Sequence, residues 1–177
     1  GSGARGLLLR EREESLAVTG VVPTPAAADI ARRSFAHNGL SARILTGDLR
    51  DRSLFPANAF DLVTSNPPWF PMGSGRSGGP ARSEEGCSLP ELCAAAGYLT
   101  RPGGRFALVH RPERLPDLFA ALRAGGLEPK RMALVQHSLT AAPSAVLVEA
   151  VRQGRPGLEV LPTLLQHPSQ PGPGPQP

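Results

Sequence analysis

The sequence predicts an α/β fold in three layers, in which helices flank a mostly parallel sheet with an antiparallel last strand. Short apolar segments rich in β-branched residues alternate along the chain with amphipathic stretches at helical spacing. The last two apolar segments, 132–135 and 145–150, are joined by too few residues for a crossover helix, so we expect them to pair antiparallel. At 177 residues the chain is long enough to bury a sizeable core.

Each predicted strand is a short apolar run bounded by turn-forming residues. The predicted strands are 16–22, 44–48, 60–64, 106–109, 132–135 and 145–150. Three helices are predicted between them, from the following local signals. The segment 24–39 opens with a Thr-Pro cap and closes on Asn-Gly, 88–99 opens with a capping box, and 115–126 stops at two glycines. The Pro-Gly-Gly at 102–104 is expected to break the second helix.

Composition favours a single domain over residues 1–166, followed by a proline- and glycine-rich tail at 167–177 that is expected to be disordered. The chain has no apolar run of the roughly 18 residues that a membrane span needs. Cys87 and Cys93 match neither a metal pattern nor a disulfide framework, so a reducing cytoplasm is the expected location and no metal is expected. The net charge of +4 permits an anionic partner without requiring one.

The most informative stretch is Asn66-Pro67-Pro68-Trp69, which ends the strand 60–64 abruptly because proline has no N–H to donate to a sheet. Ligands of open α/β sheets collect at the carboxyl ends of strands, where Asn66 is expected. The Asn66 side-chain oxygen and the Pro67 carbonyl could accept hydrogen bonds from a planar amine while Trp69 stacks on its ring, a contact worth roughly 1–3 kcal/mol per base. Alternatively, Asn-Pro-Pro is a turn that merely ends a strand.

This stretch resembles the Asn/Asp-Pro-Pro-aromatic motif of S-adenosylmethionine-dependent amino methyltransferases. The flanking segments 47–51, 102–106 and 110–114 are similar to the bacterial tRNA (adenine-N6)-methyltransferases that modify valine tRNA beside the anticodon. The resemblance covers roughly residues 1–165 and implies a Rossmann-like class I methyltransferase fold. It also implies N6-methylation of a tRNA adenine, with Asn66, Pro67, Pro68 and Trp69 as the catalytic motif. The closing antiparallel hairpin distinguishes methyltransferases from dehydrogenases.

The resemblance further implies a set of cofactor-binding residues. Gly1 and Gly3 would be the last two glycines of the cofactor loop, although Gly-Ser-Gly is also typical of a leftover linker. Asp48 would accept from the amine of the cofactor's adenine, with Leu49 near its ring and Asn66 close by; alternatively, Asp48 caps a turn. Val22 stands where the family carries an acid for the ribose hydroxyls, which a valine cannot bind.

The resemblance implies that the family's first, central strand is missing from this chain, and losing it would be expected to expose ladder groups on two neighbouring strands. This departure and Val22 motivate a second hypothesis, that the chain is a truncated, non-catalytic relative that keeps the fold and binds RNA. Other amines, in protein glutamine, ribosomal RNA or DNA adenine, remain alternative substrates, and no oligomeric state is predicted. A nicotinamide oxidoreductase would match the G-x-G-x-x-G letters at 1–6, but no strand precedes them.

Overall fold

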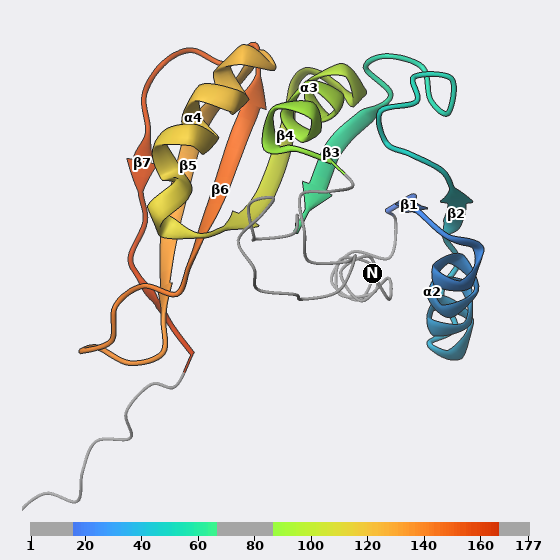
Figure 1. The fold of residues 1–177 in the computed structure, drawn as a ribbon, viewed down its shortest axis with the longest axis horizontal. Helices are drawn as coiled ribbons and strands as arrows, with labels where there is room; N and C mark the ends of the chain where they lie inside the picture. Colours follow the sequence, from blue (N-terminus) through green and yellow to red (C-terminus); the bar gives the residue numbers. More distant parts are fainter. Residues whose placement is uncertain (1–15, 67–86, 167–177) are drawn as a thin grey trace, which may run out of the picture. The chain divides into compact units, whose positions relative to one another are not determined.

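The computed structural model describes residues 16–66 and 87–166. The chain divides into two compact units, Gly1–Leu54 and Phe55–Pro177 (Figure 1). Each unit contains its own sheet.

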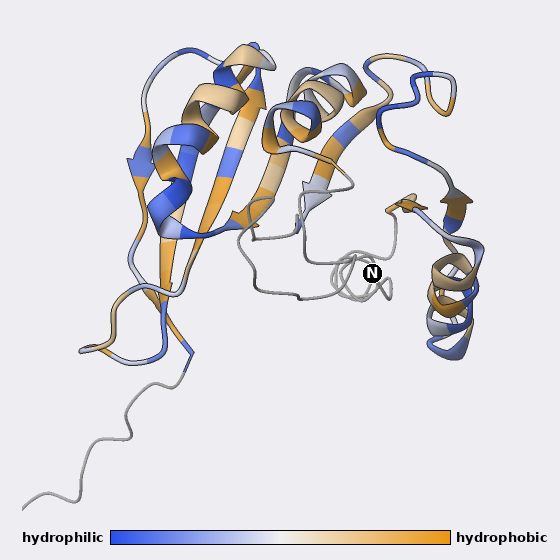
Figure 2. Ribbon diagram, in the orientation of Figure 1, coloured by the Kyte–Doolittle hydropathy of each residue, from blue (hydrophilic) through white to orange (hydrophobic). Residues whose placement is uncertain are grey.

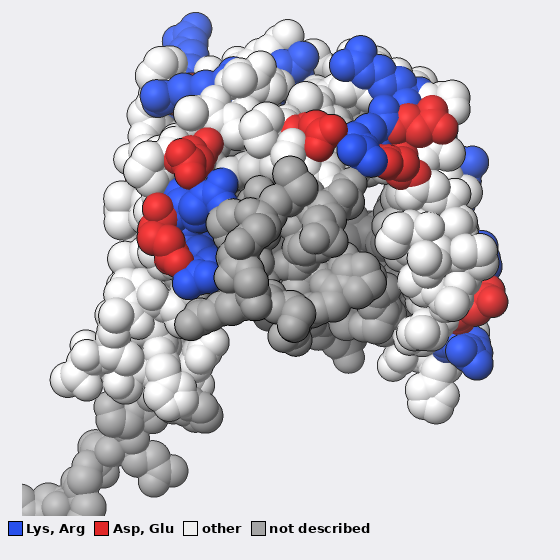
Figure 3. All heavy atoms as spheres, in the orientation of Figure 1, with Lys and Arg blue, Asp and Glu red and all other residues white. Residues whose placement is uncertain are grey.

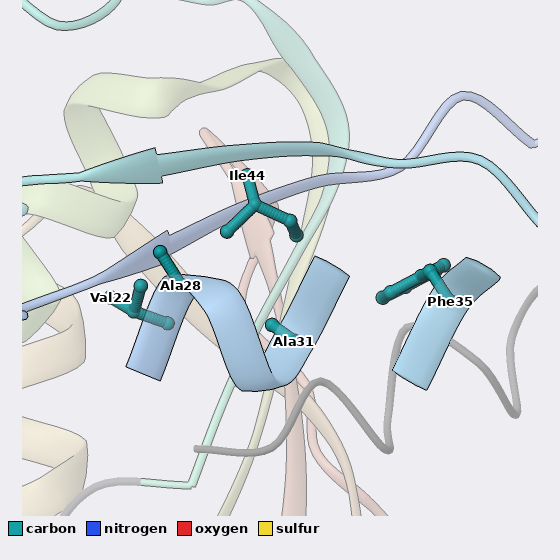
Figure 4. Close-up of a cluster of buried hydrophobic side chains, with 5 residues drawn as sticks. All are labelled: Val22, Ala28, Ala31, Phe35 and Ile44. Atoms are coloured by element: carbon teal, nitrogen blue, oxygen red, sulfur yellow. The ribbon is translucent and has the colours of Figure 1, made fainter. Parts of the chain in front are cut away.

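In the first unit, strands β1 (Thr19–Val22) and β2 (Arg43–Thr46) pair in parallel, and helix α2 (Pro25–His37) connects them. The helix begins where it was predicted to, because the Thr24 hydroxyl accepts a hydrogen bond from the Ala27 N–H at 3.2 Å. One face of α2 packs against the two strands in a small hydrophobic cluster (Figure 4). The buried members of this cluster are Val22, Ala28, Ala31, Phe35 and Ile44.

The second unit is built on a mixed sheet whose strands follow the order β3, β4, β6, β5 and β7, with β8 also paired to β5. Its long strands are β3 (Phe60–Ser65), β4 (Thr100–His110), β5 (Leu127–Gln136) and β6 (Ala145–Arg152), and its short strands are β7 (Glu159–Val160) and β8 (Leu164–Leu165). β3 runs parallel to β4, whereas β6 lies between β4 and β5 and is antiparallel to both. The predicted antiparallel pairing of the last long strand is therefore confirmed.

Helices α3 (Leu89–Leu99) and α4 (Leu115–Ala124) pack side by side on this sheet, and a short 3-10 helix, η1 (Pro112–Arg114), precedes α4 (Figure 1). Helix α3 opens with the predicted capping box between Ser88 and Glu91. Apolar residues dominate β6 and the segment 106–109 of β4 (Figure 2), and alternate residues of β4, including Phe106 and Leu108, are fully or almost fully buried. This alternation is expected for strands that have one face against helices.

The predicted start of β4 is wrong. β4 begins at Thr100 instead of residue 106 and continues through the Pro-Gly-Gly segment, because that segment forms an irregularity within the strand. Phe60 pairs with Thr100, and the register then shifts so that Leu62 pairs with Arg105. Gly103 has a positive φ of 75°, which favours glycine, and the extra residues leave the ladder without ending it.

Sequence patterns also missed β7 and β8, which are two residues long and largely exposed. Within residues 16–66 and 87–166, β1 pairs with β2 and with no other strand, and β3 pairs with β4 alone. The absence of a central strand and the domain limits 1–166 remain predictions, and the tail at 167–177 lies outside the described residues. No helix in the described ranges is long and apolar enough to cross a membrane.

Candidate functional site

Asn66 follows directly after the last residue of β3, and its side chain is exposed. Ser65 pairs in parallel with Leu108 of β4, so the carboxyl ends of two neighbouring strands lie at the same edge of the sheet. Ligands of open α/β sheets bind at this kind of edge. The position of Asn66 therefore agrees with a side chain that meets a substrate and does not pack into the core.

Several contacts fix the segment that leads into β3. The Phe60 ring packs edge-to-face on Phe55, with 5.3 Å between ring centroids. The Tyr98 hydroxyl of α3 donates to the Phe55 carbonyl at 3.3 Å, and the Asn58 N–H donates to the Tyr98 carbonyl at 2.8 Å. Because its start is held against α3, β3 presents its carboxyl end, and hence Asn66, in a defined direction.

The other members of the predicted catalytic motif, Pro67, Pro68 and Trp69, lie outside the described residues, as do Gly1 and Gly3. Their assigned roles remain predictions. Among the predicted site residues, the described ranges contain Val22, Asp48 and Leu49 in the first unit and Asn66 in the second.

His110 ends β4, next to the strand that carries Asn66, and only 1% of its surface is exposed. Its Nδ1 atom accepts the N–H of Arg111 at 2.9 Å. An accepting Nδ1 has no proton, so the neutral ring carries its proton on Nε2. This hydrogen bond fixes the turn that leaves β4.

The arginines that follow His110 lie beside carboxylates. Arg111 pairs with Glu113 at 2.6 Å and Arg114 with Asp117 at 2.8 Å. On the face drawn in Figure 3, acidic side chains accompany several groups of basic ones. The positive charges of Arg111 and Arg114 are therefore partly neutralised by neighbouring carboxylates.

Asp48 lies just beyond β2, after a Gly47 N–H that donates to the Val22 carbonyl at 3.0 Å. Its side chain is exposed and is held by Arg50, whose Nε lies 2.9 Å from both carboxylate oxygens. Hydrogen bonds from the Arg50 side chain and backbone lower the pKa of Asp48 below its ordinary value. Leu49, between them, is half-buried. Arg50 was not among the predicted site residues, because the sequence gives no pattern that places this exposed loop side chain on Asp48.

The described residues fit one half of the predicted cofactor. Asp48 offers carboxylate oxygens at the end of β2 for an adenine amine. In contrast, Val22 ends β1 as a member of the hydrophobic cluster, 7% exposed, and can offer only apolar contact where ribose hydroxyls are expected. In residues 16–66 and 87–166, no group of three or more His, Cys, Asp or Glu side chains could hold a metal ion.

No family model matches the chain. The chain is 37% identical over 126 residues to the tRNA1(Val) (adenine(37)-N6)-methyltransferase of Porphyromonas gingivalis, a match that covers 67% of this chain and 49% of the relative. It is 32% identical to a 4-amino-L-phenylalanine/4-methylamino-L-phenylalanine methyltransferase of Streptomyces pristinaespiralis, in a match that covers 71% of this chain and 46% of that relative. It is 30% identical to the release factor glutamine methyltransferase of Deinococcus radiodurans, in a match that covers 71% of this chain and 48% of that relative. The chain thus spans about half the length of these relatives.

Two solved structures support the fold. A protein from Agrobacterium tumefaciens described as a predicted O-methyltransferase superposes with a TM-score of 0.76 at 23% identity, covering 97% of this chain and 79% of that one. The geranyl diphosphate C-methyltransferase of Streptomyces coelicolor, solved with S-adenosyl-L-homocysteine, superposes with a TM-score of 0.63 at 15% identity. This match covers 86% of this chain and 69% of that one.

The fold is therefore that of the Rossmann-like class I methyltransferases, as the sequence predicts. Within this class, the chain is a relative of the bacterial tRNA1(Val) (adenine(37)-N6)-methyltransferases, which confirms the predicted resemblance.

Proposed function

We propose that this chain transfers a methyl group from S-adenosylmethionine to the exocyclic amine of an adenine in tRNA. The observation that carries the proposal is the exposed Asn66 at the carboxyl end of β3, followed in the sequence by Pro67-Pro68-Trp69. The identity of 37% to a tRNA adenine-N6 methyltransferase supports this choice of substrate.

The bound cofactor would supply an electrophilic methyl group on its sulfonium. The Asn66 side-chain oxygen and the Pro67 carbonyl would accept the two N–H groups of the adenine amine, which turns the nitrogen lone pair out of conjugation with the ring. Pro68 would stiffen the loop, and Trp69 would stack on the base after it flips out of the RNA. The amine would lose its proton after it attacks, so no strong base is needed.

Five residues of the first unit would contribute to cofactor binding. Asp48 would accept the amine of the cofactor's adenine, and Leu49 would pack near its ring. Gly1 and Gly3 would bring backbone close to the cofactor. Val22 would contribute apolar contact where a ribose acid is expected. The net charge of +4 agrees with an RNA partner, and a cytoplasmic location follows from that substrate.

A specific observation favours a second candidate, because two of the matched relatives methylate other amines by name, in release factor glutamine and in aminophenylalanines. A third hypothesis, a non-catalytic RNA-binding relative, is motivated by Val22 at the end of β1.

The test offers methyl-labelled S-adenosylmethionine to the purified chain with three acceptors: unmodified tRNA, a release factor and 4-amino-L-phenylalanine. We expect label in the tRNA, and less with Asn66→Ala than with a control change, Thr64→Ala, on the same strand. Label in the protein or the amino acid would support the second candidate. Tight cofactor binding with no label in any acceptor would reject methyl transfer to these three substrates.

A further inference from the structure

The loop after β2 folds the side chain of Arg50 back onto Asp48. The Arg50 backbone N–H donates to Oδ1 of Asp48 at 2.9 Å, which closes a tight aspartate turn. The guanidinium Nε lies 2.9 Å from Oδ1 and 2.9 Å from Oδ2, and Nη2 also donates to Oδ2. Both carboxylate oxygens of Asp48 are therefore occupied by the same residue.

This arrangement matters because a carboxylate has two oxygens and about four positions at which it accepts hydrogen bonds. Arg50 takes most of them with its backbone and its guanidinium, and its charge also offsets that of Asp48. An adenine amine that approaches Asp48 must therefore compete with Arg50 for the same oxygens.

The surrounding loop is well fixed, so the competition concerns side chains and not the backbone. The Asp51 N–H donates to the Asp48 carbonyl at 3.0 Å, and the Leu54 N–H donates to the Asp51 carbonyl at 3.2 Å. Leu54 also packs on Gly47, where an added Cβ would lie 2.9 Å from its Cδ1. Asp48 and Arg50 are each almost half exposed, at 45% and 43% of their side-chain surface, so water and salt reach the pair.

Building on the proposed function, we propose that Arg50 sets the affinity for the adenine half of the cofactor, because it covers the Asp48 acceptor until adenine displaces it. The pair is exposed and therefore weak, so displacement lowers the affinity modestly without preventing binding. Removing the guanidinium should free Oδ2 of Asp48 as an acceptor and leave its negative charge without a partner in the Arg50 side chain, while the backbone N–H of residue 50 still donates to Oδ1.

The test measures binding of S-adenosylmethionine to the 177-residue chain by calorimetry. We expect Arg50→Gln to bind about two to five times more tightly than wild type, the range that an exposed ion pair spans. Arg52→Gln is the matched control, because it removes an equal charge from the same loop. The pKa of Asp48 is shifted by Arg50 and by burial, so this change should leave the Asp48 carboxylate as it is in wild type. Melting temperatures of both variants confirm that they are folded.

Two further measurements separate competition from a purely structural role. The uncharged probe 5′-methylthioadenosine should bind wild type more tightly as salt rises from about 0.05 M to about 0.5 M, because salt screens the pair, and this dependence should vanish in Arg50→Gln. With 5′-methylthioinosine, which lacks the amine, Arg50→Gln should bind no more tightly than wild type.

The outcomes distinguish this inference from the function beneath it. Equal or weaker binding by Arg50→Gln, with wild type binding normally, overturns the role of Arg50 alone. An absence of cofactor binding by both wild type and Arg50→Gln overturns the proposed function and this inference together. Tighter binding by Arg50→Gln that disappears when Asp48→Asn is added supports both.

Discussion

Ser65 of β3 lies directly opposite Leu108 of β4 in a parallel register. Because the two strands run in the same direction, Asn66, which follows β3, and His110, the last residue of β4, both lie at the carboxyl edge of the sheet. Their environments differ sharply: Asn66 is exposed and His110 is buried. We therefore assign Asn66 to the substrate and His110 to the stability of this edge.

Replacing His110 should destabilise the fold. His110→Ala removes a buried ring and the acceptor of the Arg111 N–H, so we expect the free energy of unfolding to fall by about 2–4 kcal/mol in urea titration. The control is His137→Ala, at an exposed position, where a change within about 0.5 kcal/mol is expected. Equal losses in the two variants would show that His110 is not a core residue.

Adding one methyl group at Gly97 should also destabilise the fold, although alanine normally favours a helix by about 1 kcal/mol over glycine. A Cβ at Gly97 of α3 would lie 2.0 Å from the backbone oxygen of Gly125, beyond the end of α4. Backbone cannot yield as a side chain can, so we expect Gly97→Ala to lose about 2–3 kcal/mol of unfolding free energy in denaturant titration.

Gly103→Ala provides the comparison for Gly97→Ala. A Cβ at Gly103 would meet open space, but the residue has a positive φ of 75°. The free energy of unfolding of Gly103→Ala should therefore fall only by the conformational cost of about 1 kcal/mol. A stabilised Gly97→Ala would show that α3 and α4 do not approach each other this closely.

Acid should weaken the sheet through Glu149, which pairs with Arg131 at 3.1 Å and with Arg105 at 3.4 Å across three strands. Burial raises the pKa of Glu149, but the hydrogen bond from Arg131 and the two positive charges outweigh it, so the pKa is lowered from 4.5. A lowered folded-state pKa means that the stabilisation is present above the unfolded-state pKa and is lost as pH falls through the folded-state value.

We therefore compare the free energy of unfolding at about pH 6 and about pH 3 by urea titration. On acidification, wild type should lose up to about 1 kcal/mol more of this free energy than Glu149→Gln. The exposed Glu159 provides a control, since Glu159→Gln should retain the acid sensitivity of wild type. Identical acid sensitivity of Glu149→Gln and wild type would contradict this role.

The two cysteines should react at different rates. Burial, with a smaller contribution from Cys87, raises the pKa of Cys93 to about 12, and its side chain is fully buried in α3. A thiol reagent should therefore modify the half-buried Cys87 first, and Cys93 only when the protein unfolds. Mass spectrometry of the native protein checks this expectation, and early labelling of Cys93 would show that α3 opens without global unfolding.

Local chemistry explains which elements could be predicted from the sequence. The cap at Thr24 and the capping box from Ser88 to Glu91 depend on residues three apart, and the structure confirms both. The start of β4 was missed because Pro-Gly-Gly usually breaks an element, whereas here pairing with β3 carries the strand through it. The short strands β7 and β8 depend on β5 as a template and carry no pattern of their own.

The candidate site divides in the same way. The position of Asn66 at the end of β3 could be predicted, because the two prolines that follow it cannot continue a strand. The contact of Arg50 with Asp48 could not, because it depends on how one exposed side chain folds within a loop. Val22 was expected beside the cofactor because it matches the position of the family's ribose-binding acid. In the structure, its side chain is buried against α2 in the hydrophobic cluster.

The most direct test of the central claim is the initial rate of methyl transfer to unmodified tRNA by wild type, Asn66→Asp and Asn66→Ala, with digestion of the product to locate N6-methyladenosine. Wild type should produce N6-methyladenosine, Asn66→Asp should retain part of the rate because it keeps an acceptor oxygen, and Asn66→Ala should be slower by about a hundredfold, the scale for losing one preorganised hydrogen-bonding group. If Asn66→Ala methylates tRNA as fast as wild type, Asn66 does not steer the amine and the proposed mechanism is wrong.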